Sequence, residues 1–173
     1  MLDRVAETPA QQVFDTARRA EPAQALEATC LLATGRVGFL AGACHAVHRP
    51  GAPLVALSNA PGDLVIRTTE REPGICCYDL VLSQLEPTAP QAIPPQVHTV
   101  IVALRAGLLA RTWEQAFAHL RDRESLGQKT LHHQLVKARF STSWAFLSQL
   151  RRELAIVGTE GVLAEPDRVH TTI

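Results

Sequence analysis

Four prolines within ten residues, from Glu86 to Pro95, divide the chain into two parts with different sequence patterns. Proline fixes φ and lacks a backbone N–H, so this density of proline opposes both helix and sheet ladder and favours an extended connector. We therefore predict a Pro-rich linker at residues 87–96, with a separate structural unit on each side of it.

Before the linker, short apolar runs alternate with turn residues such as Thr34-Gly35 and Glu72-Pro73-Gly74. This pattern is typical of short strands joined by tight turns, so we predict a small antiparallel, barrel-like β-domain over residues 25–86. Residues 1–24 form an N-terminal segment with one short helix, Gln11 to Arg19. The predicted strands are Ala28 to Ala33, Val37 to Val47, Leu54 to Ser58, Leu64 to Thr68 and Ile75 to Leu82.

After the linker, residues 97–157 carry two long runs of apolar side chains at mainly helical spacing, on either side of the turn at Leu126-Gly127. Two helices joined by a short turn form a hairpin, which alone leaves apolar faces uncovered. We expect a long helical hairpin that packs in a bundle completed by a partner subunit. The fold class is thus α+β, with residues 158–173 as a tail.

Charge and the length of the apolar runs argue against two classes of partner, nucleic acids and membranes. Seventeen basic residues match seventeen acidic ones, so no overall field attracts nucleic acid. No run approaches the roughly 20 apolar residues that a membrane span needs, and the first residues lack the pattern of a signal peptide. These features predict a cytoplasmic protein that binds neither nucleic acid nor membranes.

The cysteines and histidines do not form a metal-binding pattern. The four cysteines contain no C-x-x-C pair, which favours reduced, partly buried thiols. His45 and His48 are three apart in a predicted strand, so their side chains would point to opposite faces. We predict no metal site.

The joint between the two predicted helices combines polar groups that suit a phosphate. Arg123 offers a guanidinium, Ser125 a hydroxyl and Gln134 an amide around the Gly127 turn. These groups could hold a phosphate-bearing cofactor without doing chemistry. In the alternative interpretation, Arg123 is a surface residue at a helix C-terminus, while Ser125 and Gln134 are local caps.

The joint also resembles a known family. The segment Arg123 to Lys129, followed by His133-Gln134-Leu135, is similar to the helix junction of the acyl-CoA dehydrogenase family, where R-x-x-F-G precedes a downstream glutamine. Leu126 stands at the aromatic position of that motif. The strand-rich part resembles the second part of the family's middle β-domain, with Phe39 leading its flavin strand. The resemblance covers residues 20 to 155.

The resemblance implies an FAD site shared across a subunit interface, with five contact residues: Arg123, Ser125, Leu126, Gln134 and Phe39. It also implies acyl thioesters as substrates. Members of the family oxidise these with a glutamate base, placed either near the end of the bundle or at the start of its first helix. The chain lacks the final bundle helices and has Val97-His98 at the second position, so His98 is the one candidate base.

Three functions remain open on this basis. The chain could be a truncated or ancillary flavin-associated subunit that lacks the catalytic glutamate and forms a homo-oligomer, or a hetero-oligomer with a full-length acyl-CoA dehydrogenase-like subunit. It could be an active FAD-dependent oxidoreductase acting on the CH–CH group of acyl thioesters, with His98 or a partner's residue as base. It could also be a non-catalytic binding or oligomerisation module on the same scaffold.

Overall fold

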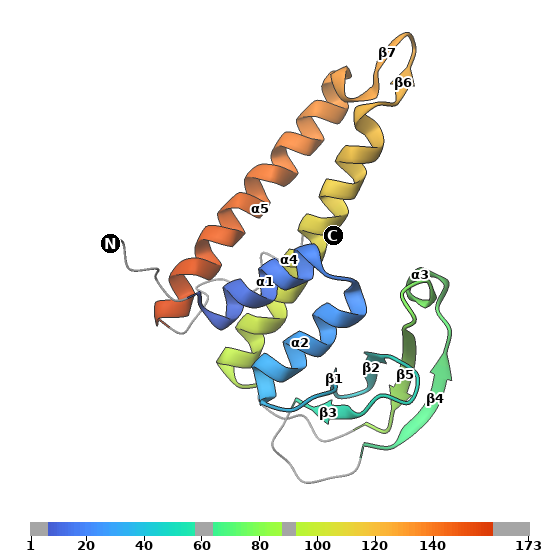
Figure 1. Cartoon of the computed structure of the whole chain (residues 1–173), viewed down its shortest axis with the longest axis vertical. Helices are drawn as coiled ribbons and strands as arrows, with labels where there is room; N and C mark the ends of the chain where they lie inside the picture. The colour runs from blue at the N-terminus through green and yellow to red at the C-terminus, as the bar shows by residue number, and fades with distance from the viewer. Residues whose placement is uncertain (1–6, 58–63, 88–92, 161–173) are drawn as a thin grey trace.

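The computed structural model describes residues 7–57, 64–87 and 93–160, which form an α+β fold. A five-stranded sheet lies at one end, and two long helices project away from it as a hairpin (Figure 1). Two shorter helices lie between the sheet and the base of the hairpin. The predicted fold class is confirmed. The predicted turn at Asn59-Ala60-Pro61-Gly62, the middle of the linker and most of the tail lie outside the described residues.

Two helices precede the sheet, where only one was predicted. Helix α1, Pro9–Arg19, begins with a capping box between Thr8 and Gln11, and it confirms the predicted short helix. Helix α2, Pro22–Thr34, replaces the strand predicted at Ala28 to Ala33, which was wrong. Proline at the first helical turn, alanine-rich helix-forming residues and Gly35 at φ 70° after the last turn all favour this second helix.

The sheet is mixed and open, whereas we predicted an antiparallel, barrel-like one. Its order is β3-β1-β2-β5-β4, and β1 pairs with β3 in parallel while the other pairs are antiparallel. The chain leaves β2 and returns on the far side of β1, which makes that pair parallel. The strands are β1 Phe39–Ala41, β2 His45–His48, β3 Leu54–Ala56, β4 Ile66–Glu70 and β5 Val81–Leu85.

Two of the predicted strands were wrong in part, because each includes a turn or a helical segment. The run from Val37 to Val47 is split into β1 and β2 by a turn, in which the Gly42 N–H donates to the His45 carbonyl. The run from Ile75 to Leu82 begins instead with a helical turn, α3 Pro73–Cys76, before β5. Prolines and turn residues at the start of the run override its apolar composition.

The predicted helical hairpin is confirmed. Helix α4 spans Pro95–Arg121 and α5 spans Gln134–Glu160. They are joined by a small β-hairpin, β6 Glu124–Ser125 and β7 Gln128–Lys129, and by the 3₁₀ turn η1 Thr130–His132. None of the helices in the described part is apolar enough over a sufficient length to cross a membrane.

Helix α1 covers the base of this hairpin, so part of the apolar face that we assigned to a partner subunit is covered within the chain. One buried cluster joins Phe14 of α1 to Ala103 of α4 and Leu150 of α5. Gly107 lets the α1 and α4 backbones approach closely. Further members are Ala10, Val13, Ala17, Val100, Ala106, Ala110, Leu147 and Leu154.

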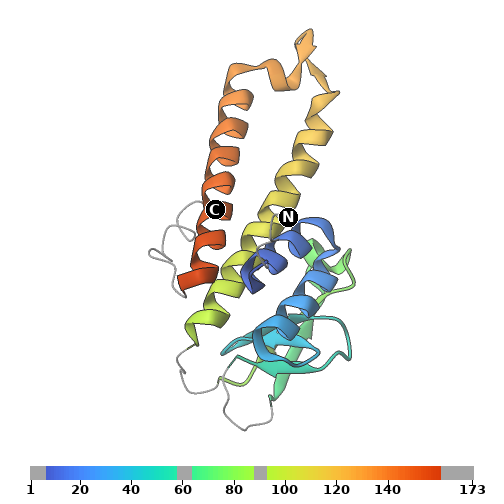
Figure 2. The same cartoon turned by 60° about the vertical axis from the view of Figure 1, so that its left-hand side comes forward.

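The outer half of the hairpin projects beyond this core (Figure 2). In the described part of α4 no residue after Ala110 is buried, and in that of α5 none before Leu147 is. The two arms meet there through a cluster of aromatic rings in edge-on and tilted contact: Trp113, Phe117, Phe140 and Trp144. The hairpin therefore presents its tip to solvent, far from the sheet.

Candidate functional site

The tip of the hairpin is a tight β-turn between β6 and β7. Leu126 and Gly127 both have positive φ, 53° and 77°, as a type I′ turn requires. Glycine adopts this conformation freely, but leucine pays for the clash between its Cβ and the carbonyl, about 1 kcal/mol. Leu126 is also 93% exposed. A strained backbone that displays an apolar side chain to solvent points to a contact with another molecule.

His133 fixes this turn to the start of α5. Its Nε2 donates to the Ser125 carbonyl at 3.1 Å, and the Gln128 amide Nε2 donates to its Nδ1 at 3.0 Å. The backbone adds a bond from the Thr130 N–H to the Arg123 carbonyl at 2.8 Å. His133 is half-buried, so it is a structural link.

Arg123 lies at the base of this turn with its guanidinium exposed. Its nearest polar side chain is His119, 3.4 Å from Nη1. Within the described residues no carboxylate forms an ion pair with it, whereas Arg121 pairs with Asp122 at 3.4 Å. Five cationic side chains and two carboxylates fall between residues 119 and 139. The tip therefore carries local positive charge on a chain that is neutral overall.

Four of the predicted cofactor contacts gather at this tip. Arg123, Ser125 and Leu126 belong to the turn, and Gln134 is the first residue of α5. All four are exposed. The structure thus places a guanidinium, a hydroxyl, an amide and an apolar side chain at one exposed end of the hairpin.

His98, the candidate base, is not part of this group. It lies in the first turn of α4, half-buried, with its backbone N–H bonded to the Pro94 carbonyl at 3.1 Å. At 1.5 Å per residue, about 35 Å of helix separate it from the end of α4. A proton-transferring group must lie within hydrogen-bond reach of the reacting atom, so His98 and Arg123 cannot serve the same reacting atoms within one chain.

Phe39, the fifth predicted cofactor contact, lies in the core. Its side chain is fully buried among Ala23 of α2 and Leu80, and its ring meets the His48 ring edge-on at 6.5 Å. In this structure it supports α2 on the sheet and has no surface to offer a flavin.

A buried hydroxyl–imidazole chain escaped the sequence analysis. The Thr69 hydroxyl lies 2.8 Å from Ser83 Oγ, which lies 2.8 Å from His48 Nε2, while His48 Nδ1 is 2.7 Å from the Arg49 carbonyl. Because a carbonyl only accepts, Nδ1 is the donor, and Nε2 accepts from Ser83. A serine beside an imidazole can be a nucleophile, but Ser83 is 0% exposed and no substrate reaches it. This chain ties β2, β5 and β4 together.

We predict that Ser83→Ala destabilises the fold by about 1–2 kcal/mol, because it leaves the buried His48 Nε2 without a donor. Urea unfolding followed by circular dichroism measures the change. Ser143→Ala, at an exposed position of α5, is the matched control and should change stability by less than about 0.5 kcal/mol. Equal stability of the two variants would show that the hydrogen bonds of Ser83 contribute nothing.

The thiols differ in their exposure to solvent. All four cysteines are free, and Cys30 alone is buried. Burial raises the pKa of the Cys30 thiol, against smaller lowering effects of Thr34 and Arg36, which keeps it protonated and unreactive. Within the described residues no three His, Cys, Asp or Glu side chains are grouped to hold a metal ion.

No family model, curated protein or solved structure matches the chain.

Proposed function

We propose that this protein is an acyl-CoA dehydrogenase-like, flavin-associated subunit whose hairpin tip holds the phosphate groups of an FAD shared with a second subunit. One observation carries the proposal. Arg123, with no carboxylate ion pair in the described part of the chain, lies at the base of a strained, exposed turn that carries Ser125 and Leu126, and Gln134 begins the helix that follows.

The chemistry of these side chains fits a dinucleotide. A guanidinium binds phosphate oxygens with two parallel hydrogen bonds, and a hydroxyl and an amide add neutral donors. Leu126 would cover an apolar part of the cofactor. FAD would supply a hydride acceptor when bound, while the tip residues would bind and orient its phosphates.

The hairpin tip projects from the rest of the fold, so a second subunit would be needed to enclose a flavin bound there. Ligand sites enclose most of their ligand, and a projecting turn covers one side only. Phe39 cannot add a second wall, because it is buried beneath α2. The partner would be another copy of the chain or a full-length acyl-CoA dehydrogenase-like subunit. The cytoplasm, as a reducing compartment, would keep the exposed Cys44, Cys76 and Cys77 thiols free.

The same geometry favours an ancillary role over independent catalysis. The candidate base His98 lies about 35 Å of helix away from the tip. Oxidation of the CH–CH group of an acyl thioester would need a base from the partner. In this proposal the chain binds the cofactor, and any oxidation of an acyl thioester requires the assembly with the partner.

We predict that Arg123→Gln weakens FAD binding at least about tenfold, because a charge-assisted hydrogen bond contributes roughly 1.5–3 kcal/mol. FAD titration followed by fluorescence anisotropy, with the chain alone and with an acyl-CoA dehydrogenase subunit added, measures the change. Arg121→Gln is the control, since Arg121 is paired with Asp122 and should leave the affinity within about twofold. Equal affinities of the wild type and Arg123→Gln would exclude the proposed grip.

A further inference from the structure

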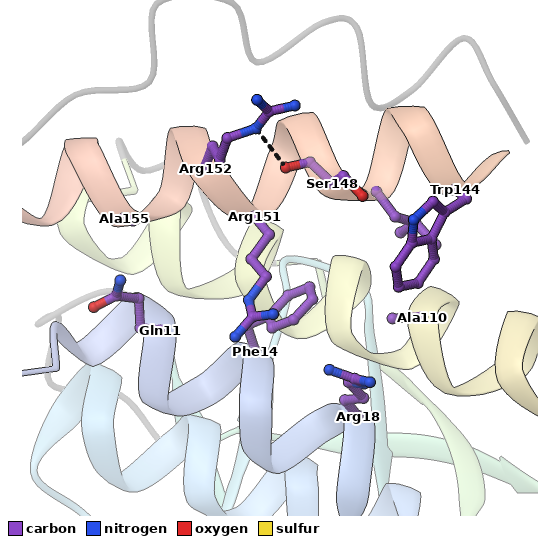
Figure 3. Close-up of a pocket in the computed structure, with 10 residues that line it drawn as sticks. Gln11, Phe14, Arg18, Ala110, Trp144, Ser148, Arg151, Arg152 and Ala155 are labelled. Atoms are coloured by element: carbon purple, nitrogen blue, oxygen red, sulfur yellow. Dashed lines mark hydrogen bonds between the residues drawn. The ribbon is translucent and has the colours of Figure 1, made fainter. Parts of the chain in front are cut away.

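A groove between α1 and the C-terminal half of α5 forms a cavity away from the hairpin tip. Its volume is about 430 Å³, within the range of small-molecule sites. The floor is apolar and comes from three helices, with Phe14 of α1, Ala110 of α4, and Trp144 and Leu147 of α5. Figure 3 shows the side chains that line the groove.

Two arginines reach over this apolar floor. Arg151 extends from α5 toward α1, and its guanidinium carbon lies 5.9 Å from the centre of the Phe14 ring. Arg18 enters from α1, where Glu114 fixes it, with Nε donating to Oε1 at 2.7 Å. Arg152 is turned away, because its Nε donates to the Ser148 carbonyl at 3.2 Å (Figure 3).

Arg151 is available to an anionic ligand. Within the described residues no carboxylate forms an ion pair with it, and no acidic side chain lines the groove. A smaller cavity of about 80 Å³ shares Phe14 and Arg151 but is lined also by Glu7 and Asp15, which would repel an anion. The larger cavity is therefore where an anionic group can sit against Arg151.

We infer that this groove binds a small amphipathic anion: a carboxylate or phosphate head on an apolar chain. The head would meet the guanidinium of Arg151, with Arg18 beside it, since the planar fork of arginine suits both groups. The apolar chain would lie over Ala110, Trp144 and Leu147, where its burial gives a favourable free energy. The site is separate from the hairpin tip and does not depend on flavin binding.

Isothermal titration calorimetry of the full chain tests this site with three probes of equal chain length: octanoate, octyl phosphate and octanol. We expect one or both anions to bind at least about tenfold more tightly than octanol, and the two heads show which source of anion the site prefers. Equal affinity for octanol, or no saturable binding of either anion, would overturn the inference.

Variants locate the site. Arg151→Gln should weaken anion binding at least about tenfold, and Arg151→Lys should weaken it less. Arg139→Gln is the control on the same helix, and it should leave anion binding unchanged because residue 139 lies outside the groove. Arg123→Gln should also leave it unchanged, which separates this site from the proposed flavin grip. Unchanged affinity in Arg151→Gln would contradict the inference. A second result would also contradict it: no anion binding to the wild type, together with a lower solution mass of Arg151→Gln than of the wild type. That result would make the groove an interface between copies of the chain.

Discussion

Gly107→Ala should destabilise the protein by about 1–2 kcal/mol, although alanine is the better helix former. A Cβ at residue 107 would overlap the Phe14 carbonyl oxygen and lie 2.6 Å from the Ala17 Cβ. Both are rigid parts of α1, so the two helices would have to separate. Overpacking of this kind typically costs 1–3 kcal/mol or more, which exceeds the gain of about 1 kcal/mol in helix propensity. Urea unfolding followed by circular dichroism measures the difference.

Gly74→Ala is the matched control, because it makes the same chemical change in the helical turn α3. A Cβ there meets no atom within 4 Å. We expect its stability to stay the same or to rise slightly. A Gly107→Ala protein as stable as the wild type would contradict the close packing of α1 on α4, and with it the assignment of that apolar face to the chain's own helix.

Trp113→Ala should destabilise the outer half of the hairpin, at a cost of about 2–3 kcal/mol for a half-buried aromatic side chain. Trp113 lies 5.3 Å from Phe117, 5.4 Å from Phe140 and 4.9 Å from Trp144 between ring centres. No buried residue of α4 or α5 supports the arms beyond it. Loss of its ring should therefore let the tip open, and amide exchange should become faster from residue 111 to 146 than in the core.

Trp113→Phe is the control for this effect. It keeps a ring between the arms and removes the indole Nε1, which is buried without a hydrogen-bond partner. The loss of an unpaired donor offsets part of the lost contact area, so we expect a change below about 1 kcal/mol. Equal amide exchange at the tip in Trp113→Ala and Trp113→Phe would show that the aromatic cluster does not hold the arms together.

Local sequence signals predicted the elements that depend on local interactions. The hairpin of α4 and α5 follows from apolar spacing and the glycine turn, and α1 from its composition and the proline that follows it at Pro22. The strand predicted at Ala28 to Ala33 failed because a short apolar run fits a helix as well as a strand, and here Pro22 and Gly35 decided the outcome. The parallel pairing of β1 with β3 has no local signal, because it depends on the path of the chain.

The candidate site divides in the same way. Arg123, Ser125, Leu126 and Gln134 are close in sequence around one turn, so their grouping could be predicted. The hydrogen bond between Ser83 and His48 joins residues 35 positions apart and depends on the pairing of β2 with β5. The groove beneath Arg151 needs three helices to meet, which no short motif reports.

The most direct test of the account is sedimentation velocity with FAD present, with protein absorbance and the visible flavin band recorded together. We predict that the flavin band sediments with the protein as a dimer, or with an added acyl-CoA dehydrogenase subunit, and that Arg123→Gln leaves it at the rate of free FAD. A flavin band that sediments as free FAD with the wild-type chain, both alone and with the added subunit, would contradict the proposal that the hairpin tip holds a shared flavin.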